Sequence, residues 1–385
     1  MIGHLSRAAI LLAASLPIVL CTATARSQVS VNGPVTSITT PPIAAANSRI
    51  DFGRAQPMPL PSVNMPPASS PQAPTSPQVF GTPGVSPGSP GTGQQLNPLT
   101  LPAPKAIPPS SPGVQPQEFG TSGQPYTTAQ VDASGDYTAS FYPFSAAGKL
   151  YFNIGTATFL CSASLITPGV VVTAAHCVAN YGQFQFYSNW VFVPSYENTA
   201  APYGTWTAAS ATILTVYYNG TDNCAVYGII CPDDVAVLLM NPDGTGTYPG
   251  YYTGWLGYGW NGYGANGSGQ ALINQLGYPV ALDGGEFMER NDSQGFVAPS
   301  LSNNTIIGSL MTGGSSGGPW AVNLGMPPTL SGISHGSGDA NNTVTHVTSW
   351  GYTDPTIKQQ GASPFTDGNI LLLVNTVCAG TPAAC

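Results

Sequence analysis

The chain has 385 residues and carries 16 Asp and Glu against 8 Lys and Arg, which gives a formal net charge of −8 at pH 7. Only three of the basic side chains, Lys149, Arg290 and Lys358, lie after residue 125, against fourteen acidic ones. Nucleic-acid-binding proteins need a basic surface to neutralise phosphates, so this composition excludes that class. The length allows more than one region, and the composition changes sharply along the chain.

Residues 1–25 have the pattern of a secretory signal peptide. The basic Arg7 precedes an apolar stretch at 8–20, and the small residues Ala23 and Ala25 follow it. This pattern predicts cleavage after Ala25 and a secreted protein, either extracellular or periplasmic.

The apolar stretch of this signal is too short to cross a bilayer as a helix, so we expect no membrane span. Cys21 offers an alternative, a lipidated N-terminus. The bulky Leu20 before this cysteine is unusual in a bacterial lipoprotein signal and disfavours the alternative.

Residues 26–125 differ from the rest of the chain in composition. Between positions 28 and 125 the sequence holds 22 of the 38 prolines, many Ser, Gly and Gln, and five charged residues. Such a segment has too few clustered apolar residues to offset the entropy lost on ordering, so we expect it to be disordered. Pro-segment, stalk and linker all remain open as its role.

From about residue 126 the sequence changes to short apolar stretches separated by Gly, Asn, Asp and Pro. Many short strands at such spacing predict an all-β barrel or sandwich. The candidate strands are residues 149–154, 163–166, 183–193, 212–218 and 235–240. One helix is expected, at residues 367–377, because its apolar residues recur at helical spacing.

Six cysteines remain once the predicted signal peptide is removed, and an even number indicates an oxidising destination. Six cysteines allow fifteen pairings, of which nearest-neighbour pairing is favoured because it closes short loops. They are Cys161, Cys177, Cys224, Cys231, Cys378 and Cys385. No His or Cys cluster has the spacing of metal ligands, so we expect no metal and no other cofactor.

Three motifs carry side chains suited to nucleophilic catalysis. Ser316 lies in TGGSSGGPW, residues 312–320, where paired glycines permit a tight turn that exposes a hydroxyl and aims backbone N–H groups at one point. His176 lies in TAAHC, and Asp234 opens an apolar stretch within DDVAVLLM. A histidine can take the serine proton when a buried aspartate holds its ring, so the three motifs together indicate acyl transfer.

Two neighbouring residues compete for these roles. Asp233 is an alternative to Asp234, but the apolar alternation that follows Asp234 favours the latter. Ser315 is an alternative nucleophile, although only Ser316 is followed directly by two glycines and a proline.

The motifs TAAHC, D-V-A-V-L and G-S-S-G-G-P, in this order, resemble those of the trypsin-like (chymotrypsin-fold) serine endopeptidases. The resemblance covers residues 140–380, so we expect a protease domain at 126–385. It implies two six-stranded antiparallel β-barrels followed by a C-terminal helix, and a disulfide between Cys161 and Cys177. Gly277-Tyr278-Pro279 resembles a bacterial subgroup that includes the glutamyl endopeptidases.

The resemblance also implies a role for each catalytic residue. Ser316 would be the nucleophile, His176 the general base and acid, and Asp234 the residue that orients the histidine. The N–H groups of Gly314 and Ser316 would form the oxyanion hole. Trypsin-type enzymes carry an Asp before the nucleophile, which pairs with a new N-terminal amine on zymogen activation. Ser315 stands there, so we expect activation to proceed without that ion pair.

The substrate pocket is expected to contain Leu310 at its base and Ser349, Trp350 and Gly351 in its wall, because VTSWG resembles the wall strand of the family. A leucine at the base disfavours basic substrate side chains. Glutamate-cutting relatives use a histidine where this chain has Thr348, so a glutamyl preference lacks support.

Two features leave the wall assignment open. Residues 331–338, SGISHGSG, are an alternative wall strand. His335 and His346 lie near the predicted pocket in sequence only, and both are expected to be ordinary surface or core histidines.

The sequence thus predicts a secreted, monomeric serine endopeptidase that acts on protein or peptide substrates through an acyl-enzyme. A catalytically silent protease-fold protein with a binding or adhesive role is one alternative. An esterase using the same three residues is another.

Overall fold

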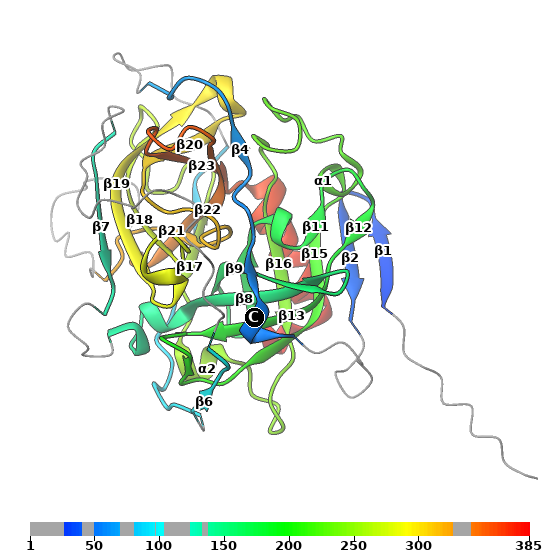
Figure 1. The fold of residues 1–385 in the computed structure, drawn as a ribbon. Helices are drawn as coiled ribbons and strands as arrows, with labels where there is room; N and C mark the ends of the chain where they lie inside the picture. Colours follow the sequence, from blue (N-terminus) through cyan, green and yellow to red (C-terminus); the bar gives the residue numbers. More distant parts are fainter. Residues whose placement is uncertain are drawn as a thin grey trace, which may run out of the picture.

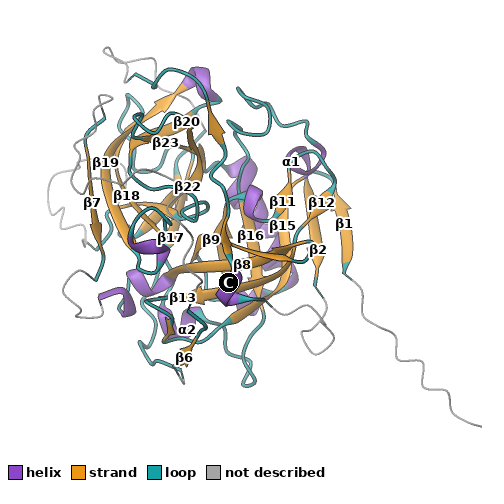
Figure 2. Ribbon diagram, viewed as in Figure 1, coloured by secondary structure: helices purple, strands orange, loops and turns teal. Residues whose placement is uncertain are grey.

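The computed structural model describes residues 27–40, 50–69, 81–96, 98–103, 124–132, 138–325 and 340–385. The predicted signal peptide, Cys21, His335 and the alternative wall strand at 331–338 lie outside the described residues. Strands dominate the described part of the chain, and they form two groups that lie next to each other (Figures 1 and 2).

The first group is a closed antiparallel barrel of six strands. Its order is β15-β13-β8-β9-β10-β16, and β16 closes the barrel by pairing with β15. Buried apolar side chains of all six strands fill its interior, Val172 and Val237 among them. The strands are β8 (Ala147–Ile154), β9 (Ala157–Leu165), β10 (Val170–Thr173), β13 (Ser188–Pro194), β15 (Trp206–Leu214) and β16 (Ala236–Met240).

The second group is also a closed antiparallel barrel of six strands, in the order β21-β18-β19-β20-β23-β22, with β21 pairing to β22. It contains β18 (Gln270–Gly277), β19 (Glu289–Ala298), β20 (Asn304–Gly308), β21 (Pro319–Val322), β22 (Thr343–Tyr352) and β23 (Gln359–Pro364). The two six-stranded barrels confirm the expected chymotrypsin-like fold. Strand β17 (Gly257–Trp260) is added in parallel to β22.

The helical elements are short. The predicted C-terminal helix is present as one π-helical turn, Asp367–Leu371, followed by α3 (Leu372–Gly380). Thr366 and Asn369 cap its start reciprocally, and Leu373 and Val374 pack on the first barrel's core. The other helices are α1 (Thr215–Asn219) and α2 (Gly250–Thr253). Among the described helices none is long and apolar enough to cross a membrane.

The described parts of residues 26–125 do not fit the expected disorder, because they form short strands, most of which join the two barrel sheets. A hairpin of β1 (Gln28–Asn32) and β2 (Val35–Thr39) extends β15, as Figure 1 shows. The remaining additions are β3 (Gln56–Pro57) on β9, β4 (Ser62–Val63) on β22, β5 (Gly84–Ser86) on β17 and β6 (Leu99–Thr100) on β14 (Ala200–Ala201). β7 (Tyr126–Gln130), just after this segment, pairs with β19.

The physical reason is that barrel strands such as β9 and β15 extend past their barrel partners, and added strands pair with the backbone left free there. A segment that pairs with an existing sheet needs no core of its own to offset its ordering entropy.

Three disulfides, Cys161–Cys177, Cys224–Cys231 and Cys378–Cys385, confirm the nearest-neighbour pairing. The remaining short strands are β11 (Ala179–Asn180) and β12 (Gln185–Phe186), which pair with each other.

Replacing Ile38 with Asp should destabilise the protein if the β1–β2 hairpin belongs to the fold. Ile38 is 8% exposed and lies in the first barrel's core, so the change loses apolar burial and places a charge there. We expect the free energy of unfolding to fall by about 2 kcal/mol or more in urea titrations. Val31→Asp, at a side chain 57% exposed, is the matched control and should have little effect. Equal effects of the two changes would contradict the packing of this hairpin.

Candidate active site

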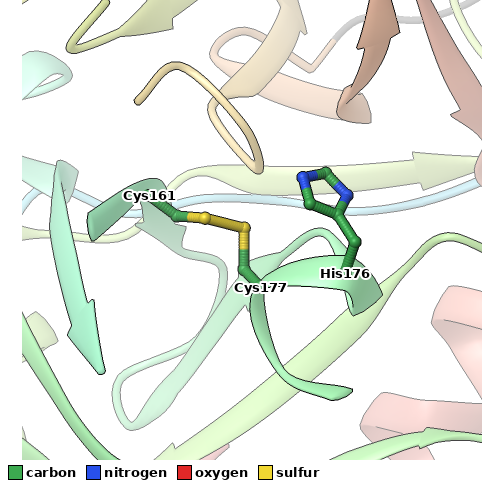
Figure 3. Close-up of side chains that lie close together, drawn as sticks. All are labelled: Cys161, His176 and Cys177. Atoms are coloured by element: carbon green, nitrogen blue, oxygen red, sulfur yellow. A yellow bond between two sulfur atoms is a disulfide. The ribbon is translucent and has the colours of Figure 1, made fainter. Parts of the chain in front are cut away.

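His176 is held at the end of a buried strand. β10 ends at Thr173, and a short 3₁₀ turn, Ala175–Cys177, then carries the histidine. The disulfide from Cys177 to Cys161 on β9 fixes this turn beside the ring (Figure 3). The residue is 5% exposed, so its ring is largely withdrawn from water.

Asp234 accepts hydrogen bonds from His176 at both of its carboxylate oxygens. The backbone N–H of His176 donates to Oδ1 at 2.8 Å, and the ring atom Nδ1 lies 2.8 Å from Oδ2. Ser349 donates the third hydrogen bond to this carboxylate, to Oδ2 at 2.6 Å. With the Nδ1 proton directed to the carboxylate, the imidazole keeps Nε2 as its basic atom.

Opposing effects act on the pKa of the Asp234 carboxyl, which is 3% exposed. Burial alone would raise this pKa, but attraction to His176 and the hydrogen bonds from His176 and Ser349 outweigh burial and lower it. Asp234 therefore stays ionised beside the imidazole ring, where it stabilises a positive charge.

Asp233, the alternative to Asp234, has different partners. Its side chain accepts a hydrogen bond from Asn369, and its backbone N–H donates to Asp222 at 3.1 Å. Burial raises the pKa of both of these neighbouring carboxyls, and for Asp222 the repulsion from Asp233 adds to the rise. The structure thus places Asp234, and not Asp233, against His176.

Ser316 lies in a tight turn that packs against the strand leading to His176. Gly317, at φ +75°, is required here because a Cβ would lie 1.9 Å from Oγ1 of Thr173. The carbonyl of Ser316 accepts a hydrogen bond from the N–H of Ser162 at 2.8 Å. Ser315 is turned elsewhere, since its hydroxyl donates to the carbonyl of Thr312 at 2.7 Å.

The turn is linked to Asp234 through the neighbouring strand. Gly317 N–H donates to the carbonyl of Thr348 at 2.8 Å, and Thr348 N–H donates to the carbonyl of Gly318 at 3.0 Å. Thr348 directly precedes Ser349, which bonds to Asp234. The structure therefore holds the turn that carries Ser316 between the strand of Ser349, which bonds to Asp234, and Thr173, which ends the strand before His176.

The reacting atoms themselves are covered. Among the described residues, neither Oγ of Ser316 nor Nε2 of His176 has a hydrogen-bond partner, and both atoms are buried. They are therefore not bonded to each other, and such contacts commonly form only when a substrate is bound. The N–H of Gly314 donates at 3.2 Å to the carbonyl of Met58, a residue of the N-terminal region.

The predicted pocket residues take different positions. Leu310 is 7% exposed, and Gly351 donates its N–H to the carbonyl of Pro61 at 2.8 Å. Ser349 points to Asp234, and fully buried Trp350 points into the second barrel, where its Nε1 donates to Asn304 at 2.7 Å. The side chains of these two residues are thus occupied, and only their backbone can form a pocket wall.

Thr348 and His346 are also occupied. Oγ1 of Thr348 accepts hydrogen bonds from Gln275 and Trp320, at 2.9 and 2.8 Å. His346 bonds through Nε2 to Thr305 at 2.8 Å, and desolvation lowers its pKa to about 3, so its ring is neutral.

Sequence reasoning missed two contributions to the site. The bond from Ser349 to Asp234 has no signal in the sequence beyond the motif itself. The second is the contribution of residues 56–63, whose composition predicts only disorder. Their prolines at 57, 59 and 61 favour an extended backbone and were the available signal.

Ser349→Ala should lower the stability of the protein at neutral pH but have much less effect in acid. At pH 7 the change removes a hydrogen bond to a charged carboxylate, which costs about 1.5–3 kcal/mol of unfolding free energy. Because the pKa of Asp234 is lowered, this contribution is present above the ordinary pKa of Asp and is lost as the carboxylate gains its proton at lower pH. Urea titrations from pH 7 to well below the ordinary pKa of Asp should therefore show the two proteins converging.

Ser309→Ala is the matched control, because its hydroxyl donates at 2.8 Å to the neutral amide of Gln275. Its cost should not change over the same pH range. A Ser349→Ala deficit that is equally independent of pH would contradict a charged acceptor at Asp234.

Part of this chain matches a known protein family. The family model described as Trypsin matches residues 133–222, which include His176 and end before Asp234 and Ser316. Among curated proteins none matches.

Several solved structures are similar to this chain. The protease Anisep from Arthrobacter nicotinovorans has 27% identity and a TM-score of 0.48, and the match covers 61% of this chain and 96% of that one. A thermostable serine protease, AL20, from an extremophilic microorganism has 24% identity over 61% and 97%, with a TM-score of 0.48. A Glu endopeptidase has 19% identity over 68% and 98%, with a TM-score of 0.45. The family match and the two closed barrels are consistent with a chymotrypsin-fold serine endopeptidase, as the sequence motifs indicated.

Proposed function

We propose that this protein is a secreted serine endopeptidase that hydrolyses peptide bonds through a covalent acyl-enzyme. The observation that carries the proposal is the double hydrogen bond from His176 to the buried Asp234. A buried carboxylate that fixes the ring by Nδ1 leaves Nε2 as a base, and Ser316 lies on the adjacent turn.

The first half of the reaction forms the acyl-enzyme. Oγ of Ser316 attacks the peptide carbonyl carbon while Nε2 of His176 takes the hydroxyl proton. The imidazolium, stabilised by Asp234, then donates that proton to the leaving nitrogen as the C–N bond breaks. In the second half, water takes the place of the departed amine and attacks the ester carbonyl while His176 takes a proton from the water. His176 then returns this proton to Oγ of Ser316 as the ester bond breaks, which restores the hydroxyl and releases the acid.

The negative oxygen formed on attack would be bound by the N–H groups of Gly314 and Ser316. The Gly314 N–H already donates to a carbonyl oxygen, that of Met58, which supports its ability to bind one at this place. Each such donor typically contributes about 10²- to 10³-fold to the rate.

The substrate side chain bound nearest to the cut bond is inferred to be uncharged. Leu310 offers no carboxylate for Lys or Arg, and the Thr348 hydroxyl already accepts two hydrogen bonds from other side chains. The charged Asp234, which bonds to the wall strand β22 through Ser349, is already engaged by His176 as well.

The domain organisation follows as part of the proposal. Residues 1–25 are a signal peptide, residues 26–125 precede the catalytic part, and residues 126–385 form a monomeric protease domain. The three disulfides are typical of proteins that fold in an oxidising compartment, which supports secretion. Ser315 cannot pair with a new N-terminal amine, so activation would use other contacts.

Ser316→Ala should lower kcat/KM for peptide hydrolysis by about 10⁴-fold or more, because no other group can form the acyl-enzyme. The measurement is cleavage of a mixed peptide library by the secreted protein, before and after limited digestion. Ser315→Ala, the adjacent serine in the same turn, serves as the control and should keep its rate within a few fold. Undiminished hydrolysis by the Ser316 variant would rule out this mechanism.

A further inference from the structure

Residues 56–63, which we call the cleft segment, cross from one barrel to the other directly over the candidate site. At its start β3 pairs in parallel with Phe159 and Leu160 of β9 in the first barrel. At its end β4 pairs in parallel with Gly351 and Tyr352 of β22 in the second. Figure 1 shows the chain that leads to β4 passing between the two groups of strands.

The middle of the cleft segment lies against the oxyanion turn. The carbonyl of Met58 accepts the N–H of Gly314 at 3.2 Å, while its own N–H donates to the carbonyl of Leu160 at 2.8 Å. A Cβ on Gly313 would lie 3.1 Å from the same Met58 oxygen. The Gly314 N–H assigned to the oxyanion hole is therefore occupied, and a substrate carbonyl cannot take that place while Met58 is there. The Oγ of Ser316 on the same turn is buried and without a hydrogen-bond partner.

The far end of the cleft segment is anchored on the predicted pocket wall. Gly351 N–H donates to the carbonyl of Pro61 at 2.8 Å, and Thr353 N–H donates to that of Val63 at 3.0 Å. A Cβ on Gly351 would lie 2.8 Å from Cδ2 of Leu60, so Leu60 covers the wall closely. Val63 is 5% exposed and packs in the same apolar cluster as Trp350.

The direction of the cleft segment is opposite to that of a substrate. Hydrolysis leaves the acyl half of a substrate, its N-terminal half, on Ser316, and the pocket proposed for that half's side chain includes Gly351 on β22. A substrate must therefore run from β22 toward β9, whereas the cleft segment runs from β9 to β22.

We propose that the cleft segment is a built-in inhibitor, which occupies the substrate cleft in reverse and must leave before a peptide can bind. This inference rests on the proposed protease function. Reversal also protects the cleft segment from the enzyme, because the nitrogen that follows the Met58 carbonyl lies on the acyl side. That nitrogen belongs to Pro59 and carries no hydrogen, so its amide differs from an ordinary substrate bond.

The test is a double variant, Leu60→Glu/Val63→Asp, in the full chain. It places charges where the two side chains meet Gly351 and the Trp350 cluster, so the end of the cleft segment should detach. A fluorophosphonate probe should then label Ser316 at least tenfold faster than in the parent, with a matching rise in peptide cleavage. The matched control is Val31→Asp/Leu99→Glu, the same substitutions at N-terminal side chains 57% and 46% exposed, and it should label like the parent. Thermal unfolding of both variants verifies that they fold.

A peptide of residues 55–64 provides a second measurement that does not need turnover. The peptide, carrying fluorescein, should bind the double variant and slow the reaction of that variant with the fluorophosphonate probe. The same peptide with both substitutions should neither bind nor slow that reaction. Parent labelling as fast as that of the double variant, or failure of the peptide to bind, would overturn the inhibitory role. Binding of the peptide with no labelling of any chain would instead overturn the proposed protease function and leave the cleft segment as the occupant of this cleft.

Discussion

The rest of this structure depends on the hydrogen bonds that the buried carboxylate of Asp234 accepts. A charge that is 3% exposed is tolerated only when donors surround it, and here they come from His176 and Ser349. His176 follows a strand of the first barrel, whereas Ser349 lies on β22 of the second. Because Asp234 also donates its own N–H to Ser363 on β23, at 3.2 Å, one residue joins the two barrels at the site.

The position of the candidate nucleophile follows from that junction. Ser349 bonds to Asp234 from β22, and the adjacent Thr348 exchanges backbone hydrogen bonds with Gly317 and Gly318. The turn also presses on Thr173 at the end of β10, where only a residue without a Cβ fits at position 317. The nucleophile's turn is therefore held by both barrels, and a shift of either one would move Ser316.

Much of the fold was predictable because its signals are local. Short apolar stretches indicated a barrel architecture, and closely spaced cysteines gave three correct disulfides. Two of the motifs carry His176 and Asp234, which the structure places in contact. The additions before residue 126 were not predictable from composition. β3 and β4 are two residues long and exist because β9 and β22 offer them backbone partners, which a proline-rich sequence does not reveal by itself. For the same reason the hydroxyl of Ser349, predicted in the pocket wall, was not expected on Asp234.

The covalent connection of the cleft segment to the barrels has a kinetic consequence. A tethered ligand faces its site at an effective concentration of the order of millimolar, so even modest contacts keep the site closed. A single break in the chain between the cleft segment and the barrels would leave the same hydrogen bonds but end this covalent connection. The segment could then diffuse away, and dilution would oppose its return. Such an enzyme would stay silent at any concentration while its chain is intact, and would become active once the chain is cut and the protein is diluted.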